Sequence, residues 1–156
     1  MDSLCYNMDE RGEYTLRNFI SGTYRYQIDD KGRIRIPAKI KSLLGEKLWI
    51  SVGDQENLVI YTEEMIDQLY DKYAKLEPTD PAYKRQRYVF ANTFRFQGDA
   101  QDRFQIPQIL CDMIGLKDKA LFIGMANRVE IWKEETYYDT LAKDNPDKII
   151  RRTEGE

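Results

Sequence analysis

The sequence contains no histidine and only two cysteines, and both shortages exclude kinds of chemistry. Without imidazole, a catalytic triad or dyad that depends on histidine to move protons near neutral pH cannot form. Cys5 and Cys111 form no Cys-x-x-Cys pair, which disfavours zinc sites, haem sites and disulfide scaffolds. Ser42 and Ser51 lack an activating neighbour, and the sequence has no phosphate-binding loop motif. We therefore predict that the protein is not an enzyme and that it uses no metal or cofactor.

Long apolar runs are also missing. No stretch approaches the roughly 20 apolar residues that a membrane-spanning helix requires, and the first residues lack the basic-then-apolar order of a signal peptide. We expect a cytoplasmic protein without a membrane partner. Of the 156 residues, 42% are apolar and 33% are charged, which is typical of a soluble globular protein and sufficient for one compact body built from two small halves.

The most informative feature of the sequence is an internal duplication. Residues 25–45 align without gaps on residues 95–115 at an offset of 70, and seven of these 21 positions are identical. The identical pairs are Arg25/Arg95, Gln27/Gln97, Asp29/Asp99, Arg33/Arg103, Ile36/Ile106, Pro37/Pro107 and Gly45/Gly115. After one inserted residue the alignment resumes at an offset of 71, pairing Gly53 with Gly124. The chain therefore holds two diverged copies of one unit, at residues 21–76 and 92–143.

The first half of each copy is predicted to be a hairpin followed by a short helix. In the first copy, residues 23–28 and 34–36 have the composition of strands and flank a tight turn at Asp30-Lys31-Gly32. Pro37 fits the first position of a helix, which Gly45 would end.

The second half of each copy is predicted to be another hairpin and an amphipathic helix. Strands at 48–52 and 58–61 are joined by a five-residue loop, and the second copy repeats them at 120–123 and 129–132. Thr62 is a candidate N-cap of the helix. The apolar face of this helix comprises Met65, Ile66, Leu69, Tyr70, Tyr73 and Leu76. The unit is thus ββαββα, and two tandem units give a mainly β fold with short helices, of the α+β class.

Three segments lie outside the copies. Residues 77–91 are predicted to form a connecting turn and a helix that starts near Asp80-Pro81. Residues 1–20 and 144–156 are polar and aperiodic, and we expect them to be mobile tails without regular structure.

Each copy has an Asp-x-x-x-Arg turn that leads into Ile-Pro. Asp29 and Arg33, with Gly32 between them, lie close enough for a charge-assisted hydrogen bond, and Asp99 and Arg103 repeat the pattern. One interpretation is a structural clamp of the hairpin, because such surface ion pairs are common and contribute only about 0–1 kcal/mol. The other interpretation is that the turn positions basic side chains for a ligand.

The charge distribution bears on the second interpretation. Residues 24–47 carry seven cations and three anions, a balance of +4, whereas the equivalent residues 94–117 are neutral and the whole chain has a net charge of −3. A basic two-stranded ribbon on an acidic body is typical of a surface that follows DNA phosphates and enters the major groove. The candidate DNA-binding residues are Arg25, Lys31, Arg33, Arg35, Lys39 and Arg103, with Arg33 and Arg35 the first candidates for base contacts.

These residues belong to a larger pattern that resembles the MraZ family. Gly22-x-Tyr24, then Asp29-x-x-Gly32-Arg33 and Ile36-Pro37-Ala38, resemble the opening signature of MraZ proteins. The aromatic segment at 87–91 is similar to the one before the family's second repeat, and Gly124-x-x-Asn127-Arg128-Val129-Glu130-Ile131-Trp132 is similar to its C-terminal signature.

The resemblance implies a bacterial transcriptional regulator, a repressor that binds repeated promoter boxes in double-stranded DNA upstream of the division and cell-wall gene cluster. It implies an AbrB-like swapped-hairpin fold, or double-split β-barrel, in which two SpoVT-AbrB-like units pack about a pseudo-two-fold axis. It also implies a nucleoid-associated protein that forms ring-shaped homo-oligomers.

The second turn departs from the family pattern. Asp102 replaces the turn glycine and adds a negative charge beside Arg103, although aspartate tolerates left-handed geometry better than most residues. We therefore hypothesise that copy one contacts DNA, while copy two mainly supports the fold and assembly.

An alternative is a ring-forming assembly or interaction protein that does not read DNA, in which helix aromatics would be partner surfaces. The two functions differ in salt dependence, because phosphate contacts weaken steeply as salt rises.

Overall fold

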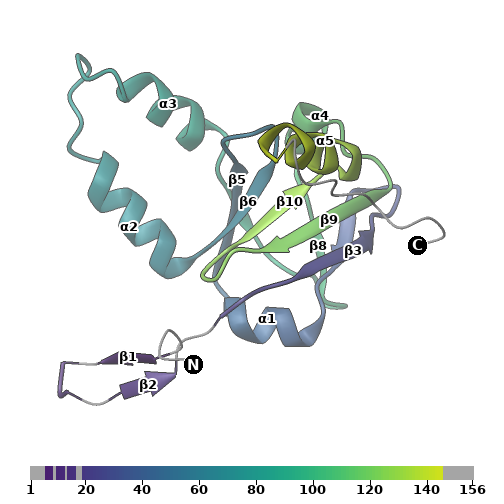
Figure 1. Cartoon of the computed structure of the whole chain (residues 1–156), viewed down its shortest axis with the longest axis horizontal. Helices are drawn as coiled ribbons and strands as arrows, with labels where there is room; N and C mark the ends of the chain where they lie inside the picture. The colour runs from purple at the N-terminus through teal and green to yellow at the C-terminus, as the bar shows by residue number, and fades with distance from the viewer. Residues whose placement is uncertain (1–5, 9, 13, 17–18, 146–156) are drawn as a thin grey trace.

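The computed structural model of the protein describes residues 6–8, 10–12, 14–16 and 19–145. Within these ranges the body consists of a six-stranded antiparallel sheet and a separate two-stranded ribbon, with helices around them (Figure 1). No helix in the described ranges is both long and apolar enough to cross a membrane.

Both copies contain the predicted ββαββα order. The first copy comprises β3 (Thr23–Gln27), β4 (Arg33–Arg35), α1 (Ala38–Leu44), β5 (Leu48–Val52), β6 (Leu58–Thr62) and α2 (Glu63–Tyr73). After the connecting helix α3 (Tyr83–Ala91), the second copy comprises β7 (Phe94–Phe96), β8 (Arg103–Gln105), α4 (Gln108–Ile114), β9 (Lys119–Gly124), β10 (Val129–Trp132) and α5 (Glu134–Asp144). The mainly β fold with short helices is therefore confirmed.

Local signals determine where the first-copy helices begin and end. Pro37 is the N-cap of α1 rather than its first helical residue, and Gly45 ends the helix at φ 87°. The hydroxyl of Thr62 accepts a hydrogen bond of 3.3 Å from the backbone N–H of Met65, which confirms the predicted N-cap of α2. Helix α2 ends at Tyr73, earlier than the predicted face that extended to Leu76.

The prediction that residues 23–28 and 34–36 pair with each other is wrong. The turn between them closes as expected, since the N–H of Asp29 donates to the carbonyl of Arg33 at 3.0 Å. Beyond the turn the strands separate: β3 pairs with β9, and β4 pairs with β8. Both partners belong to the other copy, so the hairpins are swapped, as the family resemblance implies. Pairing across the copies places the apolar side chains of all four strands in one shared core.

The strand order of the large sheet is symmetric about its centre. The order is β3-β9-β10-β6-β5-β7, in which the first three strands are the counterparts of the last three taken in reverse. Ile34 lies opposite Phe104 in the ribbon, and these are equivalent positions of the two copies. Val59 and Glu130, also equivalent, lie opposite each other at the centre of the sheet. A pseudo-two-fold axis therefore runs through both pairs.

The strand register corrects one detail of the alignment. Leu48 lies opposite Phe96, whereas Ala120 lies opposite Tyr26, the counterpart of Phe96, so Leu48 corresponds to Ala120. The loop bond from Gly53 N–H to the Asn57 carbonyl has its counterpart at Met125 and Arg128. Gly53 thus matches Met125 rather than Gly124, because two residues rather than one are added before β9 and the following loop is one residue shorter.

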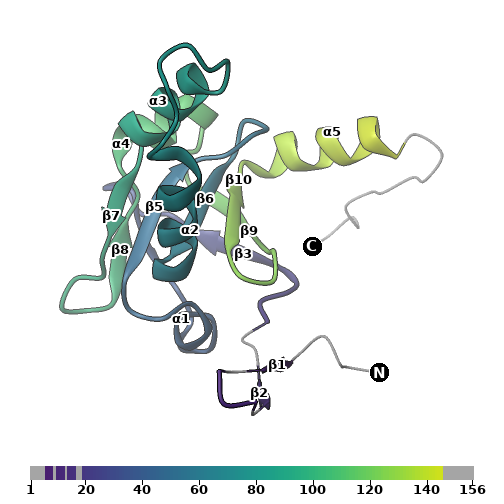
Figure 2. The ribbon, with the colours of Figure 1, turned by 90° about the vertical axis from the view of Figure 1, so that its left-hand side faces the viewer.

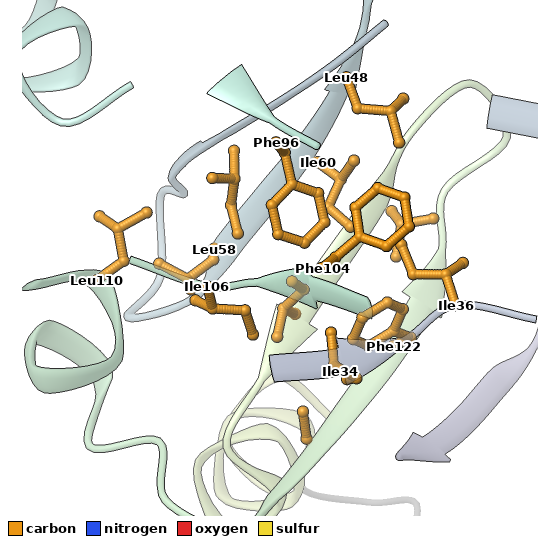
Figure 3. Close-up of a cluster of buried hydrophobic side chains, with 14 of the residues drawn as sticks. Ile34, Ile36, Leu48, Leu58, Ile60, Phe96, Phe104, Ile106, Leu110 and Phe122 are labelled. Atoms are coloured by element: carbon orange, nitrogen blue, oxygen red, sulfur yellow. The ribbon is translucent and has the colours of Figure 1, made fainter. Parts of the chain in front are cut away.

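A single core fills the space between the ribbon and the large sheet. Figure 3 shows Phe104 of the ribbon beside Phe96 and Ile34 of the ribbon beside Phe122, and Leu58 belongs to the same cluster. The ring centroids of Phe96 and Phe104 are 5.1 Å apart, and Phe96, Phe122 and Leu58 are fully buried. Because both copies line this cluster, neither copy has a complete core of its own.

The ends of the chain differ in part from the prediction of tails. Strands β1 (Tyr6–Met8) and β2 (Tyr14–Leu16) pair with each other, and Figure 2 shows this hairpin apart from the body. Ile20 is only 2% exposed and pairs with Ala126, so the predicted boundary of the N-terminal tail is wrong at this residue. The predicted C-terminal tail begins at Asp144, which is the last residue of α5; residues 146–156 lie outside the described ranges.

Truncation of Phe104 tests the shared core. Because this side chain is 3% exposed and packs between the copies, Phe104→Ala is expected to lower the free energy of unfolding by about 3–5 kcal/mol. Ile109→Ala on α4, where the side chain is 52% exposed, is the control and should change it by less than about 0.5 kcal/mol. Urea denaturation followed by circular dichroism measures both; equal effects would contradict a core shared through Phe104.

Candidate nucleic-acid interface

The outer face of the β4–β8 ribbon gathers arginines from both copies. Side chains alternate along a strand, so with Ile34 and Phe104 directed into the core, their neighbours point outward. In the antiparallel register Arg33 lies opposite Gln105, and Arg35 lies opposite Arg103. Arg35 and Gln105 are exposed, whereas Arg33 and Arg103 are partly buried. We call these four residues the ribbon face.

The first turn clamps Arg33 through one carboxylate. Asp29 Oδ1 accepts hydrogen bonds from the backbone N–H groups of Lys31 and Arg33, at 2.9 and 2.8 Å. Asp29 Oδ2 accepts from Arg33 Nε at 2.7 Å. Because the clamp uses Nε, the two Nη atoms of Arg33 keep no hydrogen bond to any described residue, and they are available to a ligand.

Gly32 is needed in this turn for two reasons. Its φ is 77°, a left-handed conformation that side chains disfavour, and a Cβ here would lie 3.3 Å from the carbonyl oxygen of Ile106. That close approach is productive, since the Gly32 carbonyl accepts a 2.9 Å hydrogen bond from the Ile106 N–H. The first turn is thereby attached to the second copy.

The second turn reproduces the clamp without glycine. Asp99 Oδ1 accepts from the N–H groups of Gln101 and Arg103 at 2.8 and 3.0 Å, and its Oδ2 accepts from Arg103 Nε at 2.9 Å. Asp102 adopts φ 56°, so the left-handed position of the turn is retained, as expected for aspartate. The structural clamp predicted for both Asp-x-x-x-Arg turns is therefore present.

The negative charge of Asp102 has a partner that sequence reasoning missed. Lys41 Nζ of α1 lies 2.7 Å from Asp102 Oδ1, so a cation of the first copy pairs with the extra anion of the second. The position of Lys41 along α1 carried no signal of this contact, because the two residues are far apart in sequence and meet only through the exchanged strands. The Asp102 side chain is largely exposed and Lys41 is partly exposed, so the contribution of the pair to stability is small.

The hydrogen bonds of each clamp favour the ionised carboxylate. The Arg33 backbone N–H, assisted by the Arg33 side chain and the Lys31 N–H, holds the pKa of the Asp29 carboxyl below its usual value. For Asp99, the Arg103 backbone N–H is the main cause, and it likewise lowers the pKa. Both turns therefore keep a negative oxygen pair behind a positive guanidinium.

The six predicted DNA-binding residues do not all come together. Arg33, Arg35 and Arg103 share the ribbon face, and Lys31 is exposed at the adjoining turn. Gln105, which was not predicted, is the fourth member of the face and donates from its amide Nε2 to the Lys31 carbonyl at 3.2 Å. The alternation of residues 103–105 could have indicated that Gln105 points outward beside Arg103. The local sequence does not indicate that β8 pairs with β4, which brings Gln105 opposite Arg33.

The remaining two candidates lie on other elements. Lys39 is exposed in the first turn of α1. Arg25 lies on β3 in the large sheet, where its Nε is 2.7 Å from Glu134 Oε1 of α5. The side chain of Arg25 is thus engaged with the body, away from the ribbon face.

The exchanged strands, the pseudo-two-fold axis and the clamped arginines define a duplicated swapped-hairpin protein. The family model described as "MraZ protein, putative antitoxin-like" matches the chain twice, at residues 19–87 and 89–154. The chain belongs to the MraZ family.

Named relatives agree with this assignment. The transcriptional regulator MraZ of Saccharopolyspora erythraea is 33% identical over 134 residues, covering 85% of this chain and 94% of its own. The transcriptional regulator MraZ of Finegoldia magna is 36% identical, covering 73% and 80% of the two chains. That of Mesomycoplasma hyopneumoniae is 32% identical, covering 86% and 93%. The family is thus one of transcriptional regulators, which is not an enzyme class.

The lowered pKa values predict an acid dependence of stability. A carboxyl whose pKa is lower in the folded than in the unfolded protein stabilises the fold above the unfolded pKa, near 4, and this contribution is lost as pH falls through the folded pKa. We expect Asp29→Asn/Asp99→Asn to unfold at a lower temperature than the wild type at pH 7, with the difference shrinking below about pH 4. Thermal unfolding across pH measures this.

Asp30→Asn is the matched control for this experiment. It removes an exposed carboxylate that neighbours Asp29 but takes no part in the clamp. A difference from the wild type that stays constant at every pH for the double variant would contradict a stabilising role of the ionised clamps.

Proposed function

We propose that the protein is a sequence-specific DNA-binding transcriptional regulator whose β4–β8 ribbon enters the major groove. The observation that carries this proposal is the ribbon face, on which three arginines lie together and two are clamped. The major groove admits a two-stranded β-ribbon. The inward direction of Ile34 and Phe104 anchors that ribbon on the core and leaves its polar face to the groove.

The chemistry of the clamped arginines suits base recognition. An arginine held at Nε can offer its two Nη groups to the O6 and N7 acceptors of guanine. The clamp also restricts the side chain before binding, which reduces the entropy lost on complex formation. Lys31 is exposed in the turn before β4, and Lys39 is exposed in the first turn of α1. We assign both lysines to phosphate contacts, which position the protein on the duplex but do not read the base sequence.

Both copies contribute to the proposed contact, but unequally. Arg33 and Arg103 have the same clamp, which supports a DNA contact for each. Asp102 precedes Arg103, and its charge, although paired with Lys41, disfavours a nearby phosphate. We therefore assign the larger contribution to Arg33 of copy one. Arg25, engaged with Glu134, is assigned at most a peripheral role.

The proposed regulatory role follows from the family. Relatives named transcriptional regulators support regulation of transcription by this chain. We propose repression of a division and cell-wall gene cluster through repeated promoter boxes, by a cytoplasmic, nucleoid-associated protein. Several moderate ribbon contacts to neighbouring boxes would add as avidity if the subunits were held together.

We also propose homo-oligomers, with a ring as the form expected from the resemblance. Helices α2 and α3 form an arm beside the large sheet (Figures 1 and 2), and neither has a buried residue. Tyr70 is 69% exposed, and Tyr88 and Phe90 are exposed by 42% and 41%. Exposed aromatics of this kind are typical of protein interfaces. The arm is also the surface that would serve an assembly protein that does not read DNA.

Arg33→Ala tests the DNA-binding function. The variant is expected to bind a duplex from the region upstream of its own gene about 5- to 100-fold more weakly, because a bidentate arginine–guanine contact is lost. Wild-type binding should also fall steeply between roughly 50 and roughly 200 mM salt. Electrophoretic mobility shifts at the two salt concentrations measure both effects, and Arg103→Ala should have the smaller loss.

Lys143→Ala is the control for the DNA measurement. It removes one positive charge from an exposed position on α5, outside both the ribbon and the arm. An equal loss for Lys143→Ala would show that binding responds only to total charge. Absence of binding by the wild type, with subunit association unaffected by salt, would favour the assembly function instead.

Tyr70→Ser tests the arm as an association surface. If Tyr70 packs between subunits, its replacement should lower the average mass at a given protein concentration, since buried interface tyrosines contribute strongly to association. Sedimentation equilibrium measures the mass, and Met113→Ser on α4, where the side chain is 38% exposed, is the control. If both variants have the same average mass as the wild type at every protein concentration, Tyr70 does not lie in the interface.

A further inference from the structure

The ribbon face has two ends that are related by the pseudo-two-fold axis. The axis passes between Ile34 and Phe104, so it exchanges Arg33 with Arg103 and Arg35 with Gln105. One end of the face consists of Arg33 beside Gln105, and the other consists of Arg103 beside Arg35. The two arginines exchanged by the axis are clamped alike, with Nε–carboxylate distances of 2.7 and 2.9 Å.

The second exchanged pair breaks this symmetry. Arg35 and Gln105 occupy equivalent exposed positions but differ in charge and in the groups they offer. Arginine pairs with guanine through two donors, whereas glutamine pairs with adenine through one donor and one acceptor. A symmetric protein reads a palindrome, because its symmetry is matched to that of the duplex. A ribbon that is symmetric at one pair and asymmetric at the other reads two related but unequal half-sites.

Resting on the proposed DNA-binding function, we propose that the Arg35/Gln105 pair determines the orientation in which one chain binds its DNA box. The Arg33–Gln105 end recognises one half-site and the Arg103–Arg35 end the other, so the box differs between its halves at the base contacted by residue 35 or 105. Each chain is thereby directed one way along the promoter. If neighbouring subunits face the same way along the promoter, the repeated boxes that they bind must also have the same orientation.

Two single substitutions equalise the ribbon face at positions 35 and 105 without touching the clamps, and the Gly32/Asp102 difference between the turns is left as it is. Gln105→Arg places arginine at all four positions of the ribbon face, and Arg35→Gln makes both ends Arg–Gln. An arginine at position 105 would lie opposite Arg33, an arrangement that the fold already accommodates where Arg35 lies opposite Arg103. Positions 35 and 105 are both exposed, so the core is not altered. The double swap Arg35→Gln/Gln105→Arg restores unequal ends with the original charge.

The experiment is selection of bound duplexes from a pool with one random segment about one helical turn long, roughly 10 base pairs. The full chain and each variant are used, with folding checked by circular dichroism. The wild type and the double swap are expected to select unequal half-sites. Each single variant should select half-sites that are inverted copies at the base contacted by residue 35 or 105, with Gln105→Arg favouring guanine in both.

Direct binding gives the size of the effect. Gln105→Arg should prefer the symmetrised duplex over the wild-type duplex by about 5- to 100-fold, the discrimination of one bidentate contact. If both single variants bind DNA but still select the unequal wild-type half-sites, the orientation proposal is wrong while DNA binding stands. If the wild type itself selects equal half-sites, the orientation proposal is also wrong. If the wild type enriches no sequence, the proposed function fails as well.

Discussion

The pairing of Ile34 with Phe104 at the centre of the ribbon is the constraint on which the rest of the structure depends. These equivalent residues lie opposite each other and are both buried, which fixes the pseudo-two-fold axis of the chain. Strands β3 and β7 must then cross to the partner copy, and the large sheet acquires its symmetric order. The same inward pair forces residues 33, 35, 103 and 105 outward. Alternate residues of β4 and β8 therefore form the core on one face of the ribbon and the polar surface on the other.

The Asp-x-x-x-Arg turns hold that polar face in place. Each carboxylate accepts two backbone hydrogen bonds and one from a guanidinium, so the shape of the turn and the position of the arginine are set together. Structural and ligand-binding interpretations of the motif are therefore compatible. The second turn shows how the fold tolerates divergence: Asp102 adopts the left-handed conformation, and its carboxylate pairs with Lys41 of the other copy.

Local signals in the sequence predict where the helices and strands lie, but they do not predict which strands pair with each other. Thr62, Pro37 and Gly45 marked helix ends because capping depends on a few neighbouring residues. The clamp from Asp29 to Arg33 was likewise predictable from its spacing. Strand exchange was not predictable from local pattern, since a turn that closes equally well can lead into a local or a distant pairing. Only the family resemblance implied it.

The contacts that join the copies were missed for the same reason. Gln105 on the ribbon face and Lys41 beside Asp102 acquire their roles from residues far away in sequence. The sequence predicts a tail at Ile20, because a single apolar residue after a polar stretch carries no periodicity, yet Ile20 pairs with Ala126 in the body. Sequence alignment pairs Gly53 with Gly124 because the two residues are identical. The equivalent loop hydrogen bonds show that Gly53 corresponds to Met125.

Strand exchange has a consequence for how the chain is made. During synthesis from the N-terminus, β5 and β6 can pair as soon as both emerge, but β3 must wait for β9 and β4 for β8. A nascent chain that ends before β8 therefore carries two strands of the first copy with unpaired backbone groups, which are sites for pairing with another chain. Ribosomes that follow one another on the same message would hold such chains close together. Intermolecular strand pairing between nascent chains is therefore most favoured in the interval between translation of β4 and translation of β9.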